Sequence, residues 1–505
     1  MIRPIIISMA GDSGVGKTTL ARVFSMILGV ENCTILHGDD LHKYPRNHEM
    51  WDKLTHLNPE ANHLDLGDKH LRDLYDLKPI ERSAYNHKTG LFDDPVKINP
   101  TKYIIDDGLH SLYTETNKEL SSIKIYVDSP YELICHWKIN RDTRERGQSL
   151  GQVVDSMEKR RPDSDKYIKP QKDNCDIIIR FKLLSPIKNI GDSNESINLD
   201  IEYVSINEFK FKGLFDHLFA NLREYTRKIN EFAVYSRKIG RDKTLVQGPG
   251  GNLSIKLNGD LMLIKSSGVQ LKDVYHASGF SALSYNYIHD FYAASNGEIG
   301  DEDMNEVLAE ATLKGDDRAS MEAAAHAILS GDVVHTHPVY VNSILCSLNS
   351  REACAEAFDG FDYEYIPSAM PGAELTGKLL KSSSDKEIFF LENHGLIVRY
   401  GSLKECVSLT EEINEAARDY LKKKIPNFVK FEDFNGAKKE IAEGYLYPDD
   451  IMFLHATDKP YRDDVVAAHN YIVEFAGALG GVRFLDDEVV SKITQMESEK
   501  YRSKM

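Results

Sequence analysis

Residues 5–19 read Ile-Ile-Ile-Ser-Met-Ala-Gly-Asp-Ser-Gly-Val-Gly-Lys-Thr-Thr. The apolar start predicts a short buried strand, the pattern G-x-x-x-x-G-K-[ST] follows, and a helix is expected to begin at Lys17. Glycine-rich backbone N–H groups and a helix N-terminus together attract phosphate oxygens. Lys17 can reach the β- and γ-phosphates, and the Thr18 hydroxyl can bind Mg²⁺. We therefore predict a nucleoside triphosphate site formed by Gly11, Asp12, Ser13, Gly14, Val15, Gly16, Lys17, Thr18 and Thr19.

The composition is typical of a globular protein with more than one domain. A chain of 505 residues exceeds what one hydrophobic core usually fills. The formal net charge of -17 argues against nucleic acid as a partner, since a phosphate backbone requires a basic surface. The scattered cysteines favour reduced thiols in a cytoplasm, and no apolar run approaches the length of a membrane span. We expect a cytoplasmic protein with neither nucleic acid nor membrane as partner.

Short apolar runs alternate with helical patterns in the amino-terminal part of the chain. The runs at 33–36, 103–105, 123–127 and 176–179 are rich in β-branched residues, and 130–146 has a helical pattern. This alternation predicts an α/β fold with a doubly wound parallel sheet. Such a sheet binds ligands outside the carboxyl ends of its strands.

Acidic pairs follow two of these predicted strands. Asp39 and Asp40 come after the first, and Asp106 and Asp107 come after the second. A kinase needs one carboxylate to accept the proton of the acceptor hydroxyl and another to hold Mg²⁺. A single Asp at such a position is more often a helix cap or a turn residue. Beside a phosphate-binding loop, the catalytic interpretation is favoured.

Several separated motifs extend this pattern. They are His-Gly-Asp-Asp-Leu-His-Lys-Tyr at 37–44 and the segments at 59–66, 107–110, 138–147 and 161–168. In this order, over about residues 1–185, they resemble the motifs of the phosphoribulokinase/uridine kinase family and lie closer to its phosphoribulokinase branch. The resemblance implies a P-loop kinase that uses ATP and Mg²⁺.

The resemblance also assigns roles to individual residues. It makes Asp39 the catalytic base and Asp107 the second carboxylate, close to Mg²⁺. The kinase substrate would face His42, Lys43 and Tyr44. The charge that develops on the transferred phosphoryl group would be neutralised by Lys138, Arg141 and Arg146, although these residues also fit a solvated helix face.

Two positions depart from the family pattern. Asp107 stands where the phosphoribulokinase branch usually has Glu, which shortens the reach to a metal ion by one methylene. Asp40 stands where Ser is usual and is expected to add a charge near the acceptor. The extra carboxylate disfavours ribulose 5-phosphate as the acceptor, and a nucleoside kinase of the uridine type is an alternative.

The segment 183–198 is rich in Ser, Asn and Gly and predicts a loop or linker. A strand at 199–204 and a helix at 208–227 are expected to follow it. We predict a kinase domain at 1–215 and a second domain at 216–505, with a carboxyl-terminal extension from about residue 431.

The second half contains a histidine pair that is weak evidence by itself. His335 and His337 have the i, i+2 spacing that places both imidazoles on one face of a strand. In a chain with 18 histidines such a pair arises easily by chance. His394 follows the apolar run 388–391, and Glu322 is expected to open a helix before His335. Three histidines with one carboxylate are typical of an open catalytic metal site.

The surrounding motifs strengthen this interpretation. They comprise a glycine-rich turn at 247–254 followed by a strand at 255–257, a strand end at 263–268, and Ser-Met-Glu at 320–322. Together with the histidine motifs they resemble the class II aldolase/adducin family over about residues 225–430. The resemblance implies an α/β/α domain in which His335, His337 and His394 bind Zn²⁺ or a similar divalent metal and Glu322 acts as acid/base. The substrate phosphate would be held by Asn252, Ser267, Gly268 and Ser320.

The extension beyond about residue 431 resembles that of sugar-phosphate aldolases, with an apolar helical segment at 465–479. For Tyr445 and Tyr447 within it, core packing is favoured over a role as proton donor. We predict a bifunctional kinase and aldolase that acts on sugars or sugar phosphates, and by resemblance a homotetramer. The alternatives are a kinase fused to an epimerase or decarboxylase, or to a non-catalytic adducin-like module.

Overall fold

The computed structural model describes residues 3–87, 89–144, 147–192, 197, 199–257, 260–275, 278–295, 299–313, 317–382, 385–438, 440–456 and 459–496. The chain forms two compact units, Met1–Arg227 and Lys228–Met505. The boundary predicted at 215/216 falls within helix α6 (Lys212–Arg241). This helix runs past the predicted end at 227 because buried apolar side chains recur every three or four residues from Phe215 to Ile239.

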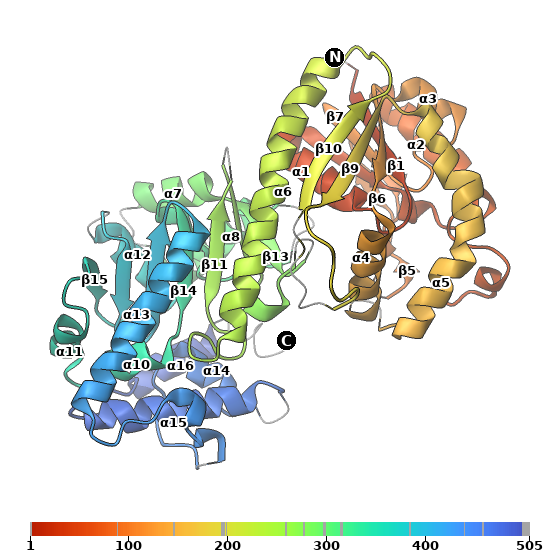
Figure 1. Ribbon diagram of the computed structural model, residues 1–505. Helices are drawn as coiled ribbons and strands as arrows, with labels where there is room; N and C mark the ends of the chain where they lie inside the picture. The colour runs from red at the N-terminus through yellow and green to blue at the C-terminus, as the bar shows by residue number, and fades with distance from the viewer. Residues whose placement is uncertain are drawn as a thin grey trace. The chain divides into compact units, whose positions relative to one another are not determined.

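The first unit is built on a six-stranded sheet in the order β10-β9-β8-β1-β7-β2 (Figure 1). Five strands are parallel, and β10 pairs antiparallel with β9 at the edge. The strands predicted from the apolar runs are confirmed. The strands of this sheet are β1 (Ile5–Gly11), β2 (Cys33–His37), β7 (Tyr103–Asp107), β8 (Ile123–Asp128), β9 (Ile177–Leu183) and β10 (Leu199–Ser205).

Helices cover both faces of this sheet, so the doubly wound architecture is confirmed (Figure 1). Helix α2 packs on one face through Leu71 and Leu74, which meet Ile6, Leu36 and Ile104 of the strands. Helix α1 packs against β1, β2 and β7. The helices of this unit are α1 (Lys17–Leu28), α2 (Leu64–Tyr75), α3 (Glu115–Leu120), α4 (Tyr131–Arg144) and α5 (Leu150–Asp163). Two small ribbons pair β3 (Ile80–Arg82) with β6 (Val96–Ile98) and β4 (Tyr85–Asn86) with β5 (Leu91–Phe92).

The second unit contains a seven-stranded sheet in the order β13-β12-β11-β14-β17-β16-β15. Its strands are antiparallel except for the parallel pair β15–β16. The strand predicted at 255–257 begins earlier, so Asn252 lies in a buried strand and not in the preceding turn. The strands are β11 (Asn252–Lys256), β12 (Leu261–Lys265), β13 (Phe280–Ser284), β14 (Asp332–Thr336), β15 (Tyr363–Ile366), β16 (Ile388–Leu391) and β17 (Gly395–Tyr400).

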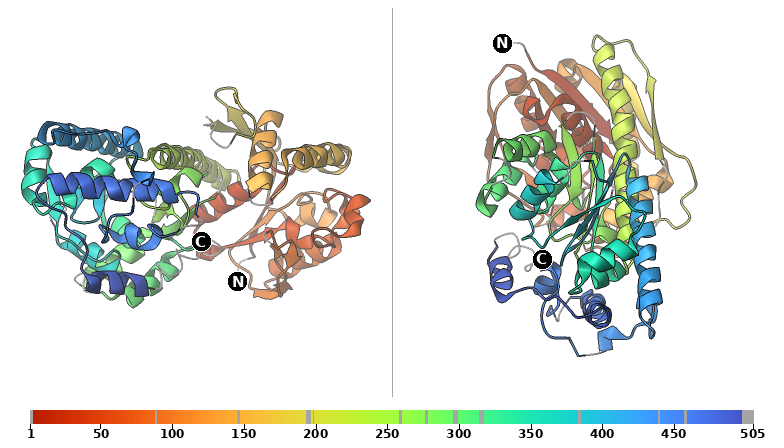
Figure 2. Two further views of the ribbon diagram at one scale, coloured as in Figure 1. Left: turned by 90° about the horizontal axis from the view of Figure 1, so that it is seen from below. Right: turned by 90° about the vertical axis from the view of Figure 1, so that its left-hand side faces the viewer.

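Helices lie on both sides of this sheet, which confirms the predicted α/β/α arrangement (Figure 2). Apolar side chains of α7, α8, α9 and α12 form the core on one face, and α13 packs on β14 and β17. The helices are α7 (Tyr285–Ala294), α8 (Asp301–Ala311), α9 (Ala323–Ile328), α10 (Val339–Leu345), α11 (Ser350–Ala357), α12 (Ala373–Lys381) and α13 (Leu403–Lys424).

The carboxyl-terminal extension is helical. It contains α14 (Pro448–Phe453), α15 (Arg462–Ala478) and α16 (Asp487–Gln495), and α15 confirms the helix predicted at 465–479. Tyr447 is 1% exposed and packs with Cys346, Leu446 and Ile472, as expected for a core residue. Within the described part of the chain, every helix is too short or too polar to cross a bilayer.

Candidate active sites

The phosphate-binding loop of the first unit depends on three glycines. Gly11, Gly14 and Gly16 have φ angles of 153°, 85° and 96°, which residues other than glycine rarely adopt. A Cβ atom at Gly11 would lie 2.5 Å from the carbonyl oxygen of Val127, so larger residues are excluded there. The loop ends at Gly16, and α1 begins at Lys17 as predicted.

The predicted loop residues have defined partners. The Lys17 Nζ donates to the carbonyl oxygens of Gly11 and Asp12 at 3.0 and 2.9 Å. Burial lowers the pKa of Lys17, and the charges of Asp107, Asp12 and Asp39 oppose this shift. The Asp12 carboxylate accepts hydrogen bonds from the Ser13 N–H and from the Ser164 hydroxyl.

The remaining loop residues surround the start of α1. Val15 is buried, and its carbonyl accepts a hydrogen bond of 3.0 Å from the Ser129 hydroxyl. Thr19 is half-buried in the first turn of α1, directly after the exposed Thr18. Thr18 is therefore the most exposed residue of this turn.

Thr18 meets Asp107 at the carboxyl end of β7. The Thr18 hydroxyl donates to the Asp107 Oδ2 at 2.8 Å, and the His37 Nδ1 lies 3.4 Å from the same oxygen. The Asp107 Oδ1 is buried without a hydrogen-bond partner among the described residues. Burial alone would lower the pKa of His37, but the Asp107 carboxylate, Asp40 and Asp39 raise it. A hydroxyl beside a carboxylate with an unsatisfied oxygen fits a Mg²⁺ ion.

Asp39 lies between two histidines. Its side chain is 41% exposed, and its two oxygens lie 3.5 Å from the His42 Nε2 and 3.4 Å from the His87 Nε2. The buried His42 is fixed through its Nδ1, which lies 2.8 Å from the Asn62 Oδ1. The sequence reasoning missed His87, which lies between the short strands β4 and β5 and carries no motif of its own.

The other predicted substrate residues lie around this group. Lys43 is exposed, and the Tyr44 ring stacks on His48 with ring centroids 4.7 Å apart.

The residues predicted to act on the phosphoryl group lie on or after α4. The buried Lys138 of α4 brings its Nζ within 3.4 Å of the Ser13 hydroxyl in the phosphate-binding loop. The Arg141 Nε donates to the neighbouring Asp142 at 2.8 Å. Arg146 lies outside the described residues.

Asp40 does not carry an unbalanced charge toward the acceptor, contrary to the expectation from the sequence. The Arg82 Nε lies 3.1 Å from the Asp40 Oδ2, with side chains only 5% and 12% exposed respectively. The other oxygen of Asp40 accepts the backbone N–H of Tyr85 at 2.8 Å. Arg82 also donates to the carbonyl of His37. The Asp40–Arg82 pair thus fixes the end of β2, from which Asp39 follows.

The second unit brings three buried imidazoles together. One ligand atom each from His335, His337 and His394 lies within 4.8 Å of the others. His335 is in β14, but this strand ends at Thr336, so His337 lies just beyond it and not within the strand as predicted. His394 lies in the turn between β16 and β17, where Asn393 has a φ angle of 53°.

The Nδ1 contacts of two imidazoles leave the same nitrogen, Nε2, for a metal ion. The His335 Nδ1 lies 3.0 Å from the carbonyl of Leu396, which can only accept. The His337 Nδ1 lies 2.9 Å from the Asp449 Oδ2. When each ring carries its single proton on Nδ1, both Nε2 atoms, which lie 3.0 Å apart, can bind a metal ion. Buried neutral imidazoles that present Nε2 fit a divalent metal ion such as Zn²⁺.

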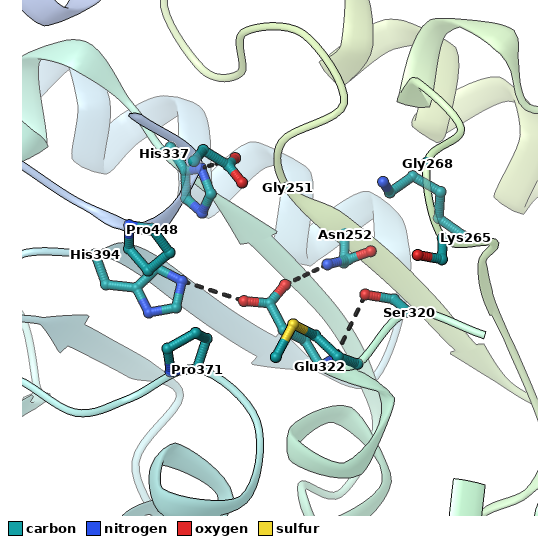
Figure 3. A pocket seen from close by; sticks show the side chains of 13 residues that line it. Gly251, Asn252, Lys265, Gly268, Ser320, Glu322, His337, Pro371, His394 and Pro448 are labelled. Atoms are coloured by element: carbon teal, nitrogen blue, oxygen red, sulfur yellow. Dashed lines mark hydrogen bonds and ion pairs between the residues drawn. The ribbon is translucent and has the colours of Figure 1, made fainter. Parts of the chain in front are cut away.

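Glu322 lies against these imidazoles at the start of α9, as predicted (Figure 3). Its Oε1 is 3.4 Å from the His335 Nε2 and 3.1 Å from the His394 Nε2. Its Oε2 accepts a hydrogen bond from the Asn252 amide. Burial would raise the pKa of Glu322, but the positive charge that His335 and His394 carry when protonated, and their hydrogen bonds to Glu322, hold it well below its usual range. An ionised Glu322 carboxylate at this position can accept a proton.

A pocket joins this group to the four residues predicted to hold a phosphate. Its lining includes His337, His394 and Glu322 together with Asn252, Ser267, Gly268 and Ser320 (Figure 3). Lys265 also lines it, and its buried Nζ donates to the carbonyls of Pro249 and Val269 at 2.8 Å each. Lys265 stood in a motif, but its role in joining two loops was not predicted.

Asp449 is the main site residue that the sequence reasoning missed. Pro448 and the following acidic residues are typical of a helix start, and they do form the first turn of α14. No local pattern indicates that the carboxylate of Asp449 meets His337.

Comparisons with known proteins support both units. Residues 6–183 match the Phosphoribulokinase / Uridine kinase family, and residues 230–421 match the Class II Aldolase and Adducin N-terminal domain. A phosphoribulokinase of Synechocystis sp. is 37% identical over 209 residues, which are 41% of this chain and 62% of that enzyme. A uridine kinase of Lactobacillus johnsonii is 32% identical over 182 residues, which are 35% of this chain and 86% of that enzyme.

The match to phosphoribulokinases is partial. The chain spans 55% of the phosphoribulokinase of Spinacia oleracea, at 34% identity over 224 residues and 41% of this chain. The solved N-terminal class II aldolase domain of a conserved protein from Thermoplasma acidophilum aligns with a TM-score of 0.35 and 24% identity, over 38% of this chain and 93% of that one. Both resemblances stated from the sequence are confirmed by the family matches. The chain belongs to the phosphoribulokinase/uridine kinase family through residues 6–183, and its residues 230–421 match the Class II Aldolase and Adducin N-terminal domain.

Proposed function

We propose that this chain is a bifunctional enzyme that phosphorylates a sugar or related alcohol with ATP and cleaves a phosphorylated sugar by metal-dependent aldol chemistry. The observation that carries the proposal is the buried group of His335, His337, His394 and Glu322, which adjoins a polar pocket. Burial of three imidazoles and a carboxylate costs desolvation free energy. Apolar side chains would fill the same space in a purely structural module without that cost.

The first unit supplies the parts of a phosphoryl transfer. The loop backbone and Lys17 would bind the phosphates of ATP, and Thr18 and Asp107 would hold Mg²⁺, which would supply a positive charge against the phosphates. Asp39 accepts the proton of the attacking hydroxyl, and its partial exposure leaves room for an acceptor. Lys138, Arg141 and Arg146 would neutralise the charge on the transferred phosphoryl group, a role that stays a prediction from the family resemblance.

The second unit supplies the parts of a carbon–carbon bond cleavage. His335, His337 and His394 would hold a divalent metal, Zn²⁺ or similar, and the bound metal would supply polarisation of the carbonyl and neighbouring hydroxyl of the substrate. Glu322 moves a proton at its Oε1, while the Asn252 amide holds the other oxygen in place. Ser267, Gly268 and Ser320 bind the substrate phosphate with hydroxyl and backbone donors.

The two activities form a chemical sequence. The kinase produces a phosphomonoester, and the pocket of the second unit is lined by hydroxyl and backbone groups that can bind a phosphate. The simplest order is phosphorylation of a ketose followed by its cleavage to dihydroxyacetone phosphate and an aldehyde. The cytoplasmic location and the homotetramer stay predictions from composition and resemblance.

The test is phosphorus NMR of the purified protein with ATP, Mg²⁺, Zn²⁺ and a panel of ketoses, sugar phosphates and uridine. A new sugar phosphomonoester that decays to dihydroxyacetone phosphate supports the proposal. If the phosphomonoester changes only its stereochemistry, the second unit is an epimerase and not a lyase. If CO₂ is released, the second unit is a decarboxylase. Accumulation without any conversion would leave a kinase with a non-catalytic second domain.

A further inference from the structure

The carboxyl-terminal extension reaches the imidazole group from outside the matched aldolase region, which ends at residue 421. We infer that Asp449 of this extension is a positioning residue that orients His337 for metal binding, so that the metal site is incomplete without the extension. The inference rests on the proposed metal centre of the second unit and adds to it a residue on which metal affinity depends.

The contact brings a carboxylate oxygen against the Nδ1 edge of an imidazole. The Asp449 Oδ2 lies 2.9 Å from the His337 Nδ1, and the two side chains are 8% and 4% exposed. The opposite nitrogen, His337 Nε2, faces His335 at 3.0 Å. A carboxylate in this position holds the proton on Nδ1, fixes the ring plane and makes Nε2 a stronger ligand.

The glycine-rich turn before β11 gives this pair its space. A Cβ atom at Gly250 would lie 2.4 Å from the Asp449 Oδ2 and 3.2 Å from the His337 Nδ1. Any larger residue would therefore push the carboxylate away from the imidazole. Gly250 does not have a positive φ angle. Glycine is therefore required here by the close approach of Asp449 and His337, and not by the backbone conformation.

A buried pair fixes the turn that carries Asp449. The neighbouring Asp450 is fully buried, and its Oδ2 accepts the backbone N–H of Leu446 at 3.0 Å and faces the His469 Nδ1 at 2.8 Å. His469 lies in α15, and its Nε2 is 3.0 Å from the carbonyl of Ala442. The start of α14 is thus held from both sides, which sets the position of Asp449.

A second connection ties the extension to the neighbour of another imidazole. Asn393, directly before His394, donates from its Nδ2 to the carbonyls of Leu446 at 2.9 Å and Arg483 at 2.7 Å. The extension therefore contacts the surroundings of two of the three imidazoles. This arrangement indicates that the extension is part of the site and not only a cover for the sheet.

The experiment measures metal binding by the full-length chain, without relying on catalysis. Zn²⁺ affinity is measured by competition with a chromophoric chelator, and the Co²⁺-substituted protein is examined by visible absorption. We expect Asp449→Asn to weaken Zn²⁺ binding about tenfold and Asp449→Ala about 100-fold, with an altered Co²⁺ spectrum in both. Circular dichroism establishes that each variant is folded.

The matched control is Asp464→Asn, which removes another carboxylate of the extension that pairs with Lys243 at 2.7 Å. It is expected to keep the affinity and spectrum of the unaltered chain. Wild-type affinity and spectrum in both folded Asp449 variants would overturn the inference while leaving the metal centre intact. Failure of the unaltered chain to bind metal at one equivalent would instead overturn the metal centre itself, and the inference with it.

Discussion

Thr18 and Asp107 are joined by a hydrogen bond of 2.8 Å although they lie 89 positions apart in the chain. Parallel pairing of β1 with β7 produces this meeting, since Met9 is aligned with Asp107 in the sheet. Asp106, one residue earlier, points to the opposite face, where its Oδ2 accepts the Asn117 amide at 3.1 Å. The two neighbouring carboxylates therefore have different surroundings and, we expect, different roles.

The first prediction compares these two carboxylates. Asp107→Asn is expected to lower the phosphorylation rate at least about 100-fold and to raise the Mg²⁺ concentration needed for half the maximal rate, because a metal ligand is lost. Initial rates over a Mg²⁺ series with a fixed ATP concentration measure both effects. Asp106→Asn is the control, since it changes the same strand without touching Thr18, and its Mg²⁺ dependence should stay near that of the unaltered chain. Equal shifts in both variants would argue against Asp107 as the ligand.

The second prediction concerns the independence of the two sites. Lys17→Ala removes the ammonium that is expected to bind phosphate, so phosphorylation should fall at least about 100-fold while a supplied phosphorylated sugar is still cleaved. His394→Ala removes a predicted metal ligand and should have the reverse effect, with loss of bound metal. Both activities are measured in each variant, with the metal content determined by elemental analysis. Loss of both activities from either folded variant would contradict independent sites.

Much of the fold could be predicted because local patterns specify it. The strand–turn–helix at residues 5–19 lies where its glycines and apolar run placed it, since both requirements are local. The apolar runs that became β7, β8 and β9 are largely buried in the sheet, which requires continuous apolar residues, whereas β2 at its edge is only partly buried. The predicted end of α6 at 227 was wrong although the sequence carries the signal, since buried and mostly apolar side chains continue at helical spacing to Ile239.

The candidate sites were predictable only where a motif marked them. His335, His337, His394 and Glu322 stand in recognisable motifs, and the structure brings them together. Asp449, His87 and Arg82 reach their partners through chain topology, which leaves no local trace in the sequence. The same limit explains why the charge of Asp40 was expected to face the acceptor: its partner Arg82 lies on the short strand β3.

The third prediction concerns the ion pair between Asp40 and Arg82, which neutralises the charge that Asp40 was expected to present to the acceptor. Asp40→Ser leaves the Arg82 guanidinium, 5% exposed, without its carboxylate, and should destabilise the chain by about 3 kcal/mol. The thermal unfolding midpoint is expected to fall by roughly 5–10 °C. The double variant Asp40→Ser with Arg82→Gln should recover part of this loss, because the unpaired buried charge is gone. If Asp40→Ser unfolds at the wild-type temperature, the pair does not stabilise the end of β2.

The fourth prediction is a pH dependence of the extension's stability. Burial would lower the pKa of His469, but its hydrogen bond to Asp450 and the charge of that carboxylate raise it above the ordinary value. The folded chain therefore holds this proton more tightly than the unfolded chain does. The resulting stabilisation is complete below the unfolded pKa of about 6.5 and is lost as the pH rises through the folded pKa.

His469→Gln removes this titration. At pH 6, where the buried pair is fully charged, the substitution should lower the free energy of unfolding by about 3 kcal/mol. At pH 9 the loss should be smaller. Calorimetric unfolding of the full chain at several pH values measures the difference. The control His289→Gln changes a histidine of α7 whose side chain is 47% exposed, and it should lower the midpoint little and equally at each pH. A cost of His469→Gln that stays constant from pH 6 to pH 9 would show that the pair contributes by packing and hydrogen bonding alone, without the charge on His469.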